Sequence, residues 1–191
     1  MNAIDARASS VVLIDYQARM MPAIHSADDV IARALMLARA AALLEVPVLG
    51  TEQNPERLGP NAEALARLCA QMVPKTHFDA CEDGLLAALD AQGPGRRQVV
   101  LAGCEAHVCL LQTALGLLRA GREVVVVENA SGSRRPSDHA AAMRRLRHAG
   151  ATIVTHEMVL FEWLHDCRHP RFREVLALVK SEPVAALHDH Q

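Results

Sequence analysis

The sequence of 191 residues has little of what marks several specialised classes of protein. Its formal net charge is only −2, so there is no basic excess that would attract nucleic acid or an anionic membrane surface. No apolar run approaches the ~20 residues that a helix needs to cross a bilayer. The opening segment MNAIDARASS carries an acidic residue and lacks an apolar core, unlike a signal peptide. We therefore expect a small-molecule partner, with no nucleic acid and no membrane.

Cysteine pairs and lysines are scarce as well. The five cysteines are an odd number and include no CxxC pair, which favours free thiols in a reducing compartment and predicts a cytoplasmic location.

Lys75 and Lys180 are the only lysines, although the chain has 20 basic residues. A lysine in an arginine-rich chain can be kept because a compact ammonium is needed. A GC-rich coding bias explains the arginine excess equally well.

Short apolar runs alternate with helical patterns along most of the chain. Runs typical of buried strands occur at residues 10–14, 47–50, 72–73, 99–101, 123–127 and 152–155. Apolar residues at helical spacing predict helices near residues 27–44, 61–70, 85–89, 106–121, 137–150, 159–164 and 172–179. This alternation predicts a three-layer, doubly wound α/β fold, in which a mostly parallel six-stranded sheet carries helices on both faces. We expect the strand order 3-2-1-4-5-6 and a single domain over residues 1–191, with a C-terminal extension from about residue 165.

Serine and glycine residues mark the expected ends of several helices. Ser26 and Ser137 each precede a helical pattern and are predicted to cap the exposed N–H groups there. Gly121 and Gly150 each follow such a pattern and are predicted to end it.

The segment QVVLAGCEAHVCLLQTALGLLRAG, residues 98–121, is the one around which the chain is organised. Gly103 breaks its buried strand, and a helix that is apolar nearly all round begins at about Ala106. Cys109 then falls in the first helical turn, where unpaired N–H groups and the helix dipole favour a thiolate and any nearby oxyanion. We therefore expect the pKa of Cys109 to lie below ~8.5. Because the helix is apolar on so many sides, we also expect a homo-oligomer (a dimer, a tetramer or a larger assembly).

Asp15 and Lys75 also follow predicted strands. Ligands of doubly wound sheets bind beyond the carboxyl ends of the strands, so Asp15, Lys75 and Cys109 would face one crevice. In such a set the thiolate attacks a carbonyl, the ammonium stabilises the thiolate, and the carboxylate carries a proton to the leaving group and later takes one from water. Each residue also has a plainer interpretation, because aspartates cap turns, lysines are usually solvated and buried cysteines usually pack.

Three motifs resemble the isochorismatase-like cysteine hydrolase superfamily: DYQ at residues 15–17, KTHF at 75–78 and GCEAHVCLLQTAL at 103–115. The resemblance covers about residues 10–179, and TEQNPERLGP at 51–60 is most similar to the divergent branch of isochorismatase domain-containing proteins. It implies Asp15, Lys75 and Cys109 as a catalytic triad. It also implies a cis peptide bond between Cys104 and Glu105, and an oxyanion hole made by the N–H groups of Glu105 and Cys109.

Two departures narrow what the resemblance implies. Isochorismatases that cleave a vinyl ether do not use a cysteine nucleophile, so Cys109 groups this chain with the amidase-like members. Nicotinamidases hold a divalent metal through a D-x-H pair and another histidine, whereas the matching loop here reads Thr51-Glu52-Gln53. We therefore expect no metal and no cofactor. The candidates for the substrate pocket are Gln17, Gln53, Phe78, Cys104 and His107.

The favoured hypothesis is a cysteine hydrolase that cleaves a small amide-like C–N bond through a thioester. A catalytically idle member that acts as a binding or assembly module is one alternative, because a triad does not guarantee turnover. A thiol redox protein that uses Cys104 and Cys109 is another, because a low-pKa thiol near a second thiol can form a disulfide. A zinc site at Cys104, His107 and Cys109 is disfavoured, because a structural site needs four well-spaced ligands.

Overall fold

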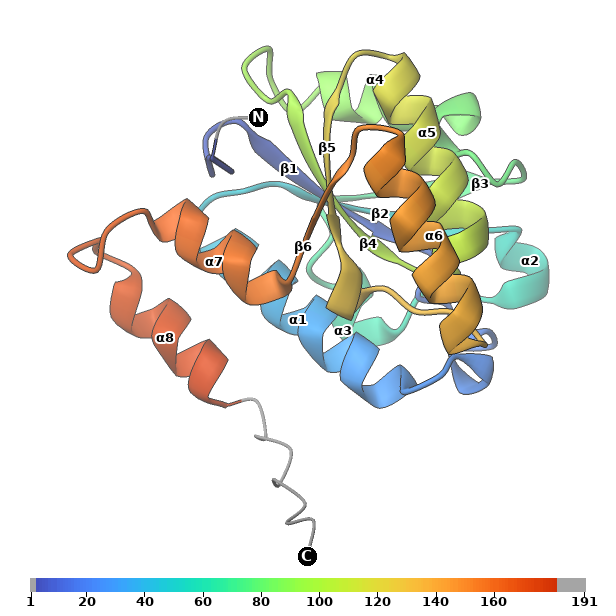
Figure 1. Ribbon diagram of the computed structural model, residues 1–191, viewed down its shortest axis with the longest axis horizontal. Coiled ribbons are helices and arrows are strands. Elements are labelled where there is room, and N and C mark those ends of the chain that lie inside the picture. The colour runs from blue at the N-terminus through green and yellow to red at the C-terminus, as the bar shows by residue number, and fades with distance from the viewer. Residues whose placement is uncertain (1–2, 182–191) are drawn as a thin grey trace, which may run out of the picture.

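Six parallel strands form the middle layer of the computed structural model, which describes residues 3–181 (Figure 1). They are β1 (Ser9–Ile14), β2 (Val48–Gln53), β3 (Gln71–Lys75), β4 (Gln98–Gly103), β5 (Glu123–Val127) and β6 (Thr152–Val154). Their spatial order is β3-β2-β1-β4-β5-β6, which confirms the predicted order. Every neighbouring pair is parallel, so the sheet is wholly parallel where the sequence predicted a mostly parallel one.

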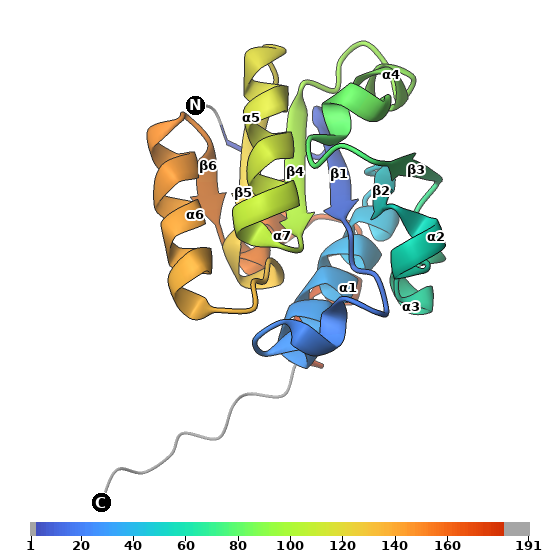
Figure 2. The same ribbon diagram turned by 90° about the vertical axis from the view of Figure 1, so that its right-hand side faces the viewer.

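Helices cover both faces of this sheet, as predicted. They are α1 (Ala27–Leu43), α2 (Pro55–Leu58), α3 (Glu63–Ala66), α4 (Leu85–Asp90), α5 (Leu111–Arg119), α6 (Pro136–His148), α7 (His156–Leu164) and α8 (Phe172–Lys180). The helices α1, α7 and α8 join the core on one face, and α4, α5 and α6 join the core on the other. Figure 2 shows β1 and β4 side by side, with α5 beginning next to the end of β4.

The two central strands explain why both faces need a cover. All residues of β1 and β4 are buried. Because side chains alternate along a strand, Val11 and Leu13 belong to the core under α1, whereas Val12 and Ile14 belong to the core under α5. An apolar strand of this kind is stable only between two layers of helices.

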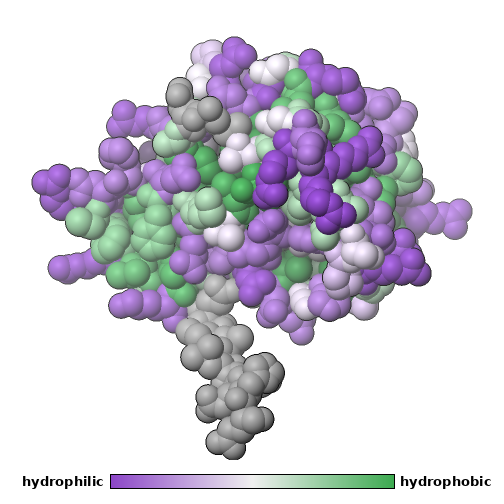
Figure 3. Space-filling model, viewed as in Figure 1, coloured by the Kyte–Doolittle hydropathy of each residue, from purple (hydrophilic) through white to green (hydrophobic). Residues whose placement is uncertain are grey.

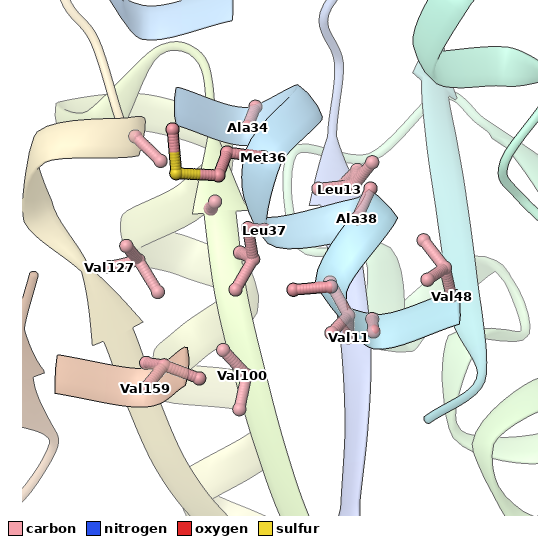
Figure 4. Packing of buried hydrophobic residues seen from close by; sticks show 14 of the residues in the cluster. Val11, Leu13, Ala34, Met36, Leu37, Ala38, Val48, Val100, Val127 and Val159 are labelled. Atoms are coloured by element: carbon pink, nitrogen blue, oxygen red, sulfur yellow. The ribbon is translucent and has the colours of Figure 1, made fainter. Parts of the chain in front are cut away.

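Small residues of α1 bring this helix close to the sheet. Ala34 and Ala38 are fully buried, and Leu37 between them is buried as well. Figure 4 shows this part of α1 packed over the strands, with Leu37 near Val100 of β4 and Val127 of β5. Burying one leucine side chain contributes roughly 1.5–3 kcal/mol, so this face holds α1 firmly on the sheet.

The chain turns sharply where β4 ends. A Cβ atom on Gly103 would lie 2.4 Å from the backbone oxygen of Ile14, so only glycine fits against β1 at this point. The peptide bond between Cys104 and Glu105 is cis, in agreement with the resemblance. A π-helical turn, Ala106–Leu110, then leads into α5, which places Cys109 in that turn rather than in the first turn of an α-helix.

The predicted helix ends are correct at the glycines and wrong at the serines. Gly121 and Gly150 follow α5 and α6 with left-handed backbones. Ser26 also has a left-handed backbone, and its hydroxyl pairs with His25 instead of capping α1. The helix α6 begins at Pro136, so Ser137 lies inside it. Proline is favoured at the first helical position because its fixed φ suits the helix and it has no N–H to satisfy.

The apolar helix α5 is covered within the chain. It packs against the sheet, against α6 and against the short turn Ala80–Asp83. Gly116 allows a close approach there, since a Cβ atom at this position would lie 2.3 Å from the carboxylate of Asp79. The apolar character of α5 therefore does not by itself require a second subunit, and the homo-oligomer stays a prediction.

The C-terminal extension packs on the core through α8. Val175 is fully buried, and Phe172 and Leu178 pack beside it against the cluster that includes α1. The part of the extension beyond residue 181 lies outside the described residues. Within residues 3–181, no helix has both the length and the apolar character to cross a membrane.

We expect Gly103→Ala to destabilise the fold, because the added methyl group has no room against Ile14. Overpacking of this kind costs about 1–3 kcal/mol and sometimes more. Urea denaturation would measure the loss. Gly95→Ala is the matched control, since a Cβ atom at Gly95 meets nothing within 4 Å, and it should leave the unfolding free energy nearly unchanged. Equal stability of the two variants would contradict the steric argument.

Candidate active site

The carboxyl ends of β1, β3 and β4 bring Asp15, Lys75 and Cys109 together. Asp15 follows β1, Lys75 is the last residue of β3, and Cys109 lies in the π-helical turn after β4. The ammonium Nζ of Lys75 lies 2.7 Å from Oδ2 of Asp15, and both side chains are fully buried. The thiol of Cys109 lies close enough to both for their charges to act on its pKa. The structure thus assembles the set that the sequence singled out.

The backbone around Asp15 aims its carboxylate into this cluster. Asp15 has a left-handed φ of 51°, a conformation that aspartate tolerates better than most residues. Its N–H still donates to the carbonyl oxygen of Thr51, which continues the pairing of β1 with β2. The hydroxyl of Thr51 donates to Oδ1 of Asp15 at 2.6 Å. Each carboxylate oxygen therefore has a polar neighbour, Thr51 on one side and Lys75 on the other.

The pKa of the Cys109 thiol contradicts the expectation from sequence. Burial, reinforced by the charge of Asp15, raises this pKa to about 12, and Lys75 lowers it only in part. The expected pKa below ~8.5 assumed a cation free to stabilise the thiolate. Here the ammonium is already paired with Asp15, so Cys109 is a neutral thiol at neutral pH, beside a carboxylate that can accept its proton.

Gln53 contacts two members of the cluster. Its Oε1 accepts from Nζ of Lys75 at 2.5 Å and lies 3.8 Å from Sγ of Cys109, which donates to it. Its Nε2 donates to the carbonyl oxygen of Thr76 at 2.7 Å. Gln53, a predicted pocket residue, therefore lies at the reacting groups.

Gln17, by contrast, is a buried residue that shapes the loop. Its side-chain amide accepts from the backbone N–H of Gln53 and donates to the carbonyl oxygens of Gln53 and Gly59. All three contacts are with backbone atoms, so Gln17 fixes the end of β2 rather than facing an open pocket.

The other predicted pocket residues lie around the turn after β4 and beyond β3. Phe78 is 49% exposed at the surface. His107 is half-buried, and its Nδ1 pairs with the hydroxyl of Ser133. Cys104 is fully buried, and burial raises its pKa to about 12. The carboxylate of Glu105 accepts from the backbone N–H and Nε of Arg134, at 3.0 Å each, which fixes the residue whose N–H is a candidate for the oxyanion hole.

The alternative chemistries find little support in this geometry. All five thiols are free, and the raised pKa values of Cys104 and Cys109 disfavour the thiolate that disulfide exchange needs. Among residues 3–181, no cluster of three histidine, cysteine, aspartate or glutamate side chains is placed to hold a metal ion. In the loop where nicotinamidases carry their metal ligands, the carboxylate of Glu52 instead accepts from the N–H of Asn61.

Thr51 is a site residue that sequence reasoning missed. It appeared only as part of the loop that departs from the metal-binding pattern. Its pairing with Ile14 places it beside Asp15 at the carboxyl edge of the sheet. A polar residue directly after the predicted strand at residues 47–50 was the signal that could have found it.

A cleft of about 700 Å³ lies at the opposite end of the sheet, lined by residues that include Asp5, Arg96 and Trp163. Three of the arginines that line it are engaged: Arg96 donates to three backbone carbonyl oxygens, Arg168 pairs with Asp166 and Arg171 pairs with Glu174. Ligands of parallel sheets bind at the carboxyl ends of the strands, which favours the Asp15–Lys75–Cys109 cluster as the reactive centre.

Comparison with known proteins gives a consistent picture of the chain's relatives. The family model described as the isochorismatase domain matches residues 9–158. Isochorismatase domain-containing protein 1 of Danio rerio is 41% identical over 175 residues, which cover 91% of this chain. The match spans 62% of that relative, so the chain covers less than two thirds of its length.

Solved structures share the fold. The MAR1 ribonuclease of Caenorhabditis elegans has a TM-score of 0.89 and 32% identity, and the match covers 97% of both chains. YcaC of Pseudomonas aeruginosa, solved with hexane-2,5-diol and covalent acrylamide, has a TM-score of 0.86 and 25% identity over 93% of this chain and 91% of that one. YcaC of Escherichia coli is described as an octameric hydrolase of unknown specificity. It has a TM-score of 0.81 and 24% identity, and the match covers 94% of this chain and 97% of that one. At this identity the match shows that the fold is shared and nothing more.

We expect the alkylation rate of Cys109 to rise with pH across the whole range in which the protein stays folded, because its pKa is raised to about 12. Asp15→Asn removes the charge that helps to raise this pKa, so it should speed alkylation at a given pH. Lys75→Met removes the opposing cation and should slow it. Peptide-resolved mass spectrometry after iodoacetamide treatment would separate Cys109 from the exposed Cys167. Slower alkylation in Asp15→Asn would show that the carboxylate already activates the thiol in the resting protein.

Proposed function

The chain belongs to the isochorismatase domain family, and we propose that it is a cysteine hydrolase that cleaves a small amide-like C–N bond. Family membership supports a hydrolase role. One observation carries the finer proposal: a carboxylate and an ammonium form a buried ion pair 2.7 Å long, and both charges act on the pKa of a neighbouring thiol. Such a set supplies a nucleophile, a base and a cation at one point.

The first step forms a thioester. Sγ of Cys109 attacks the carbonyl carbon of the amide while the thiol proton passes to the carboxylate of Asp15. The oxygen becomes an oxyanion, for which the N–H groups of Glu105 and Cys109 are the proposed donors. Asp15 then gives the proton to the nitrogen, the C–N bond breaks, and ammonia or an amine leaves.

The second step returns the enzyme to its starting state. Water attacks the thioester carbon as Asp15 takes one of its protons, and the C–S bond breaks. The proton returns to the sulfur of Cys109 while the carboxylic acid leaves. General acid–base transfer of this kind contributes about 10²–10⁴-fold to the rate. Lys75 holds Asp15 in place throughout and stabilises negative charge as it forms on the sulfur.

The burial of the cluster favours a small substrate. Cys109 is only 5% exposed, and Gln53 lies against its sulfur. A small molecule can reach such a buried sulfur more readily than a long polymer can. The name of the C. elegans neighbour makes RNA a second substrate to test, although the net charge of −2 gives the chain no overall attraction for a polyanion.

The free thiols indicate the kind of cellular compartment in which this chemistry would take place. A nucleophilic cysteine must stay reduced, and none of the five cysteines is in a disulfide. We therefore propose a reducing, cytoplasmic environment, where thiols persist.

We expect Cys109→Ala to fold normally and to lose the release of ammonia or amine from a panel of small amides. Asp15→Asn should lower turnover by at least about 100-fold, because proton transfer to and from the nitrogen is lost. Cys167→Ala, the same substitution at an exposed thiol, should keep wild-type turnover. A chelator should change nothing, because the proposed steps use no metal. Cleavage of RNA without any amide hydrolysis would overturn the proposal, and so would full activity in Cys109→Ala.

We further propose that the protein forms a homo-oligomer through α7. Met158 and Phe161 of this helix are 47% and 40% exposed, and both line a shallow cleft with Asn129 and Thr155. On the face in Figure 3, hydrophobic surface gathers over the region of α7 and α8, amid mostly hydrophilic side chains. Large exposed apolar groups that cluster in this way are typical of interfaces.

The double substitution Met158→Lys and Phe161→Lys should shift the protein toward monomer in sedimentation equilibrium, because charges replace the apolar contacts. Glu157→Lys is the control, since it adds a charge to the same helix without removing an apolar side chain. A wild-type protein that is monomeric at micromolar concentration would refute the oligomer. An unchanged oligomer in the double variant would refute this interface.

A further inference from the structure

The loop that precedes α6 is hydrogen-bonded to the turn that follows β4. The N–H of Gly132 donates to the carbonyl oxygen of Gly103, and the carbonyl oxygen of Gly132 accepts from the N–H of Ala106 at 2.7 Å. One residue further on, the hydroxyl of Ser133 pairs with Nδ1 of His107 at 3.0 Å. The loop therefore lies along the same turn that carries the N–H groups proposed for the oxyanion hole.

The N–H of Glu105 is available to an incoming oxygen. Among the hydrogen bonds within residues 3–181, none uses this N–H as the donor. The carbonyl oxygen of Glu105, in contrast, accepts from the N–H groups of Val108 and Leu110. The backbone of Glu105 is thus anchored through its carbonyl group, whereas its N–H keeps its capacity to donate.

The side chain of the same residue brings a negative charge to this place. The Glu105 side chain is only 11% exposed, so solvent screens its charge weakly. Burial raises the pKa of Cys104 to about 12, and the charges of Asp15 and Glu105 add to this effect, which shows that the Glu105 charge is felt by its neighbours. Unless a cation offsets it, this charge opposes an oxyanion at the N–H of Glu105.

Arg134 supplies that cation. Its backbone N–H and its Nε both donate to Oε2 of Glu105, at 3.0 Å each. Two donors from one residue therefore fix a single carboxylate oxygen. The side chain of Arg134 is 63% exposed, and salt bridges with an exposed partner add little to stability, so we expect the protein to fold without this side chain.

We propose that Arg134 is a positioning residue for the oxyanion hole: it neutralises the Glu105 carboxylate and fixes its direction, so that the N–H of Glu105 can bind an oxyanion. This inference rests on the proposed function, because the oxyanion is the one that forms in its thioester steps. Arg134 acts through Glu105 and takes no part in bond formation. Its loss should weaken reactions of Cys109 that create an oxyanion and leave other reactions of this thiol unchanged.

The test compares two reactions of Cys109 that differ in this respect. When Sγ adds to the carbonyl carbon of propanal, the C–S bond forms, an electron pair of the C=O bond moves to the oxygen, and the thiol proton passes to Asp15. When Sγ attacks methyl methanethiosulfonate, an S–S bond forms and methanesulfinate leaves, so no carbonyl oxygen becomes an anion. Propanal addition is read as protection of Cys109 from this second reagent, followed by peptide-resolved mass spectrometry.

In Arg134→Ala, we expect half-protection of Cys109 to need an about tenfold higher concentration of propanal, less than the ~10²–10³-fold cost of losing a whole oxyanion donor, because the N–H itself remains. Without propanal, Cys109 should react with methyl methanethiosulfonate at the wild-type rate, since the charges that act on its pKa are those of Asp15 and Lys75. Arg134→Lys keeps a cation and should recover part of the protection. The matched control is Arg135→Ala, which removes the next arginine, also exposed, and should change neither reaction.

A double-mutant comparison separates charge neutralisation from a purely structural role in the loop. If Arg134 acts by neutralising Glu105, then adding Arg134→Ala to a Glu105→Gln protein should change the protecting concentration of propanal by less than about twofold, because no charge is left to offset. A structural role predicts the same tenfold loss in both backgrounds. That result would overturn the inference even if Arg134→Ala alone behaves as expected.

Unchanged protection in Arg134→Ala would also overturn the inference, and so would an equal loss of reactivity toward methyl methanethiosulfonate, which would indicate a displaced sulfur. Failure of propanal to protect the wild-type protein would refute the oxyanion site itself. Ammonia release from small amides, measured separately, tests the proposed function. The expected propanal results without turnover would refute the hydrolase and keep the role of Arg134, whereas turnover with unchanged protection in Arg134→Ala would refute that role alone.

Discussion

The buried ion pair between Asp15 and Lys75 is the constraint on which the site depends. Removing two charges from water costs several kcal/mol for each ion, so the pair persists only with close geometry and further hydrogen bonds. The two residues belong to β1 and β3, which are separated in the sheet by β2. The side chain of Lys75 must therefore cross the end of β2, where Thr51 bonds to Asp15 and Gln53 bonds to Lys75. Thr51 and Gln53, at the end of β2, complete the site because the ion pair spans this strand.

The same pair determines the state of the nucleophile. An ammonium that already neutralises a carboxylate has little attraction left for a thiolate, and burial penalises the anion further, which is why the pKa of Cys109 is raised to about 12. Burying a neutral thiol costs little free energy. Because the thiol is neutral and Asp15 is paired with Lys75, the resting site carries no uncompensated charge. The reaction then begins with a proton shift from sulfur to Asp15, which leaves Lys75 free to stabilise the sulfur anion. Charge moves within the cluster without entering or leaving it.

Most of the fold could be predicted because each central strand is a short apolar run whose meaning does not depend on its neighbours. The residues Asp15, Lys75 and Cys109 could be selected because all three follow strands that meet at one edge of a parallel sheet. The pKa of Cys109 could not be predicted, since it depends on the distance between Lys75 and Asp15, which is a tertiary property. Ser26 failed as a cap for a similar reason: the left-handed backbone there turns its hydroxyl away from α1. Local sequence patterns predict the helices and strands, whereas the hydrogen-bond partners of polar side chains can be identified only from the folded structure.

In the motif DYQ, one backbone conformation determines where three side chains lie. In a regular strand, Asp15 and Gln17 would share a face and Tyr16 would take the other. The left-handed conformation of Asp15 breaks this alternation. Its carboxylate enters the reactive cluster, Tyr16 is buried with its hydroxyl donating to the carbonyl oxygen of Ala130, and Gln17 holds the backbone of Gln53. A substitution at Gln17 would therefore act on Cys109 through the position of Gln53, although the Gln17 side chain bonds only to backbone atoms. The site thus extends one layer beyond the groups that react, because the side chain that covers the sulfur is only as well placed as the strand end that carries it.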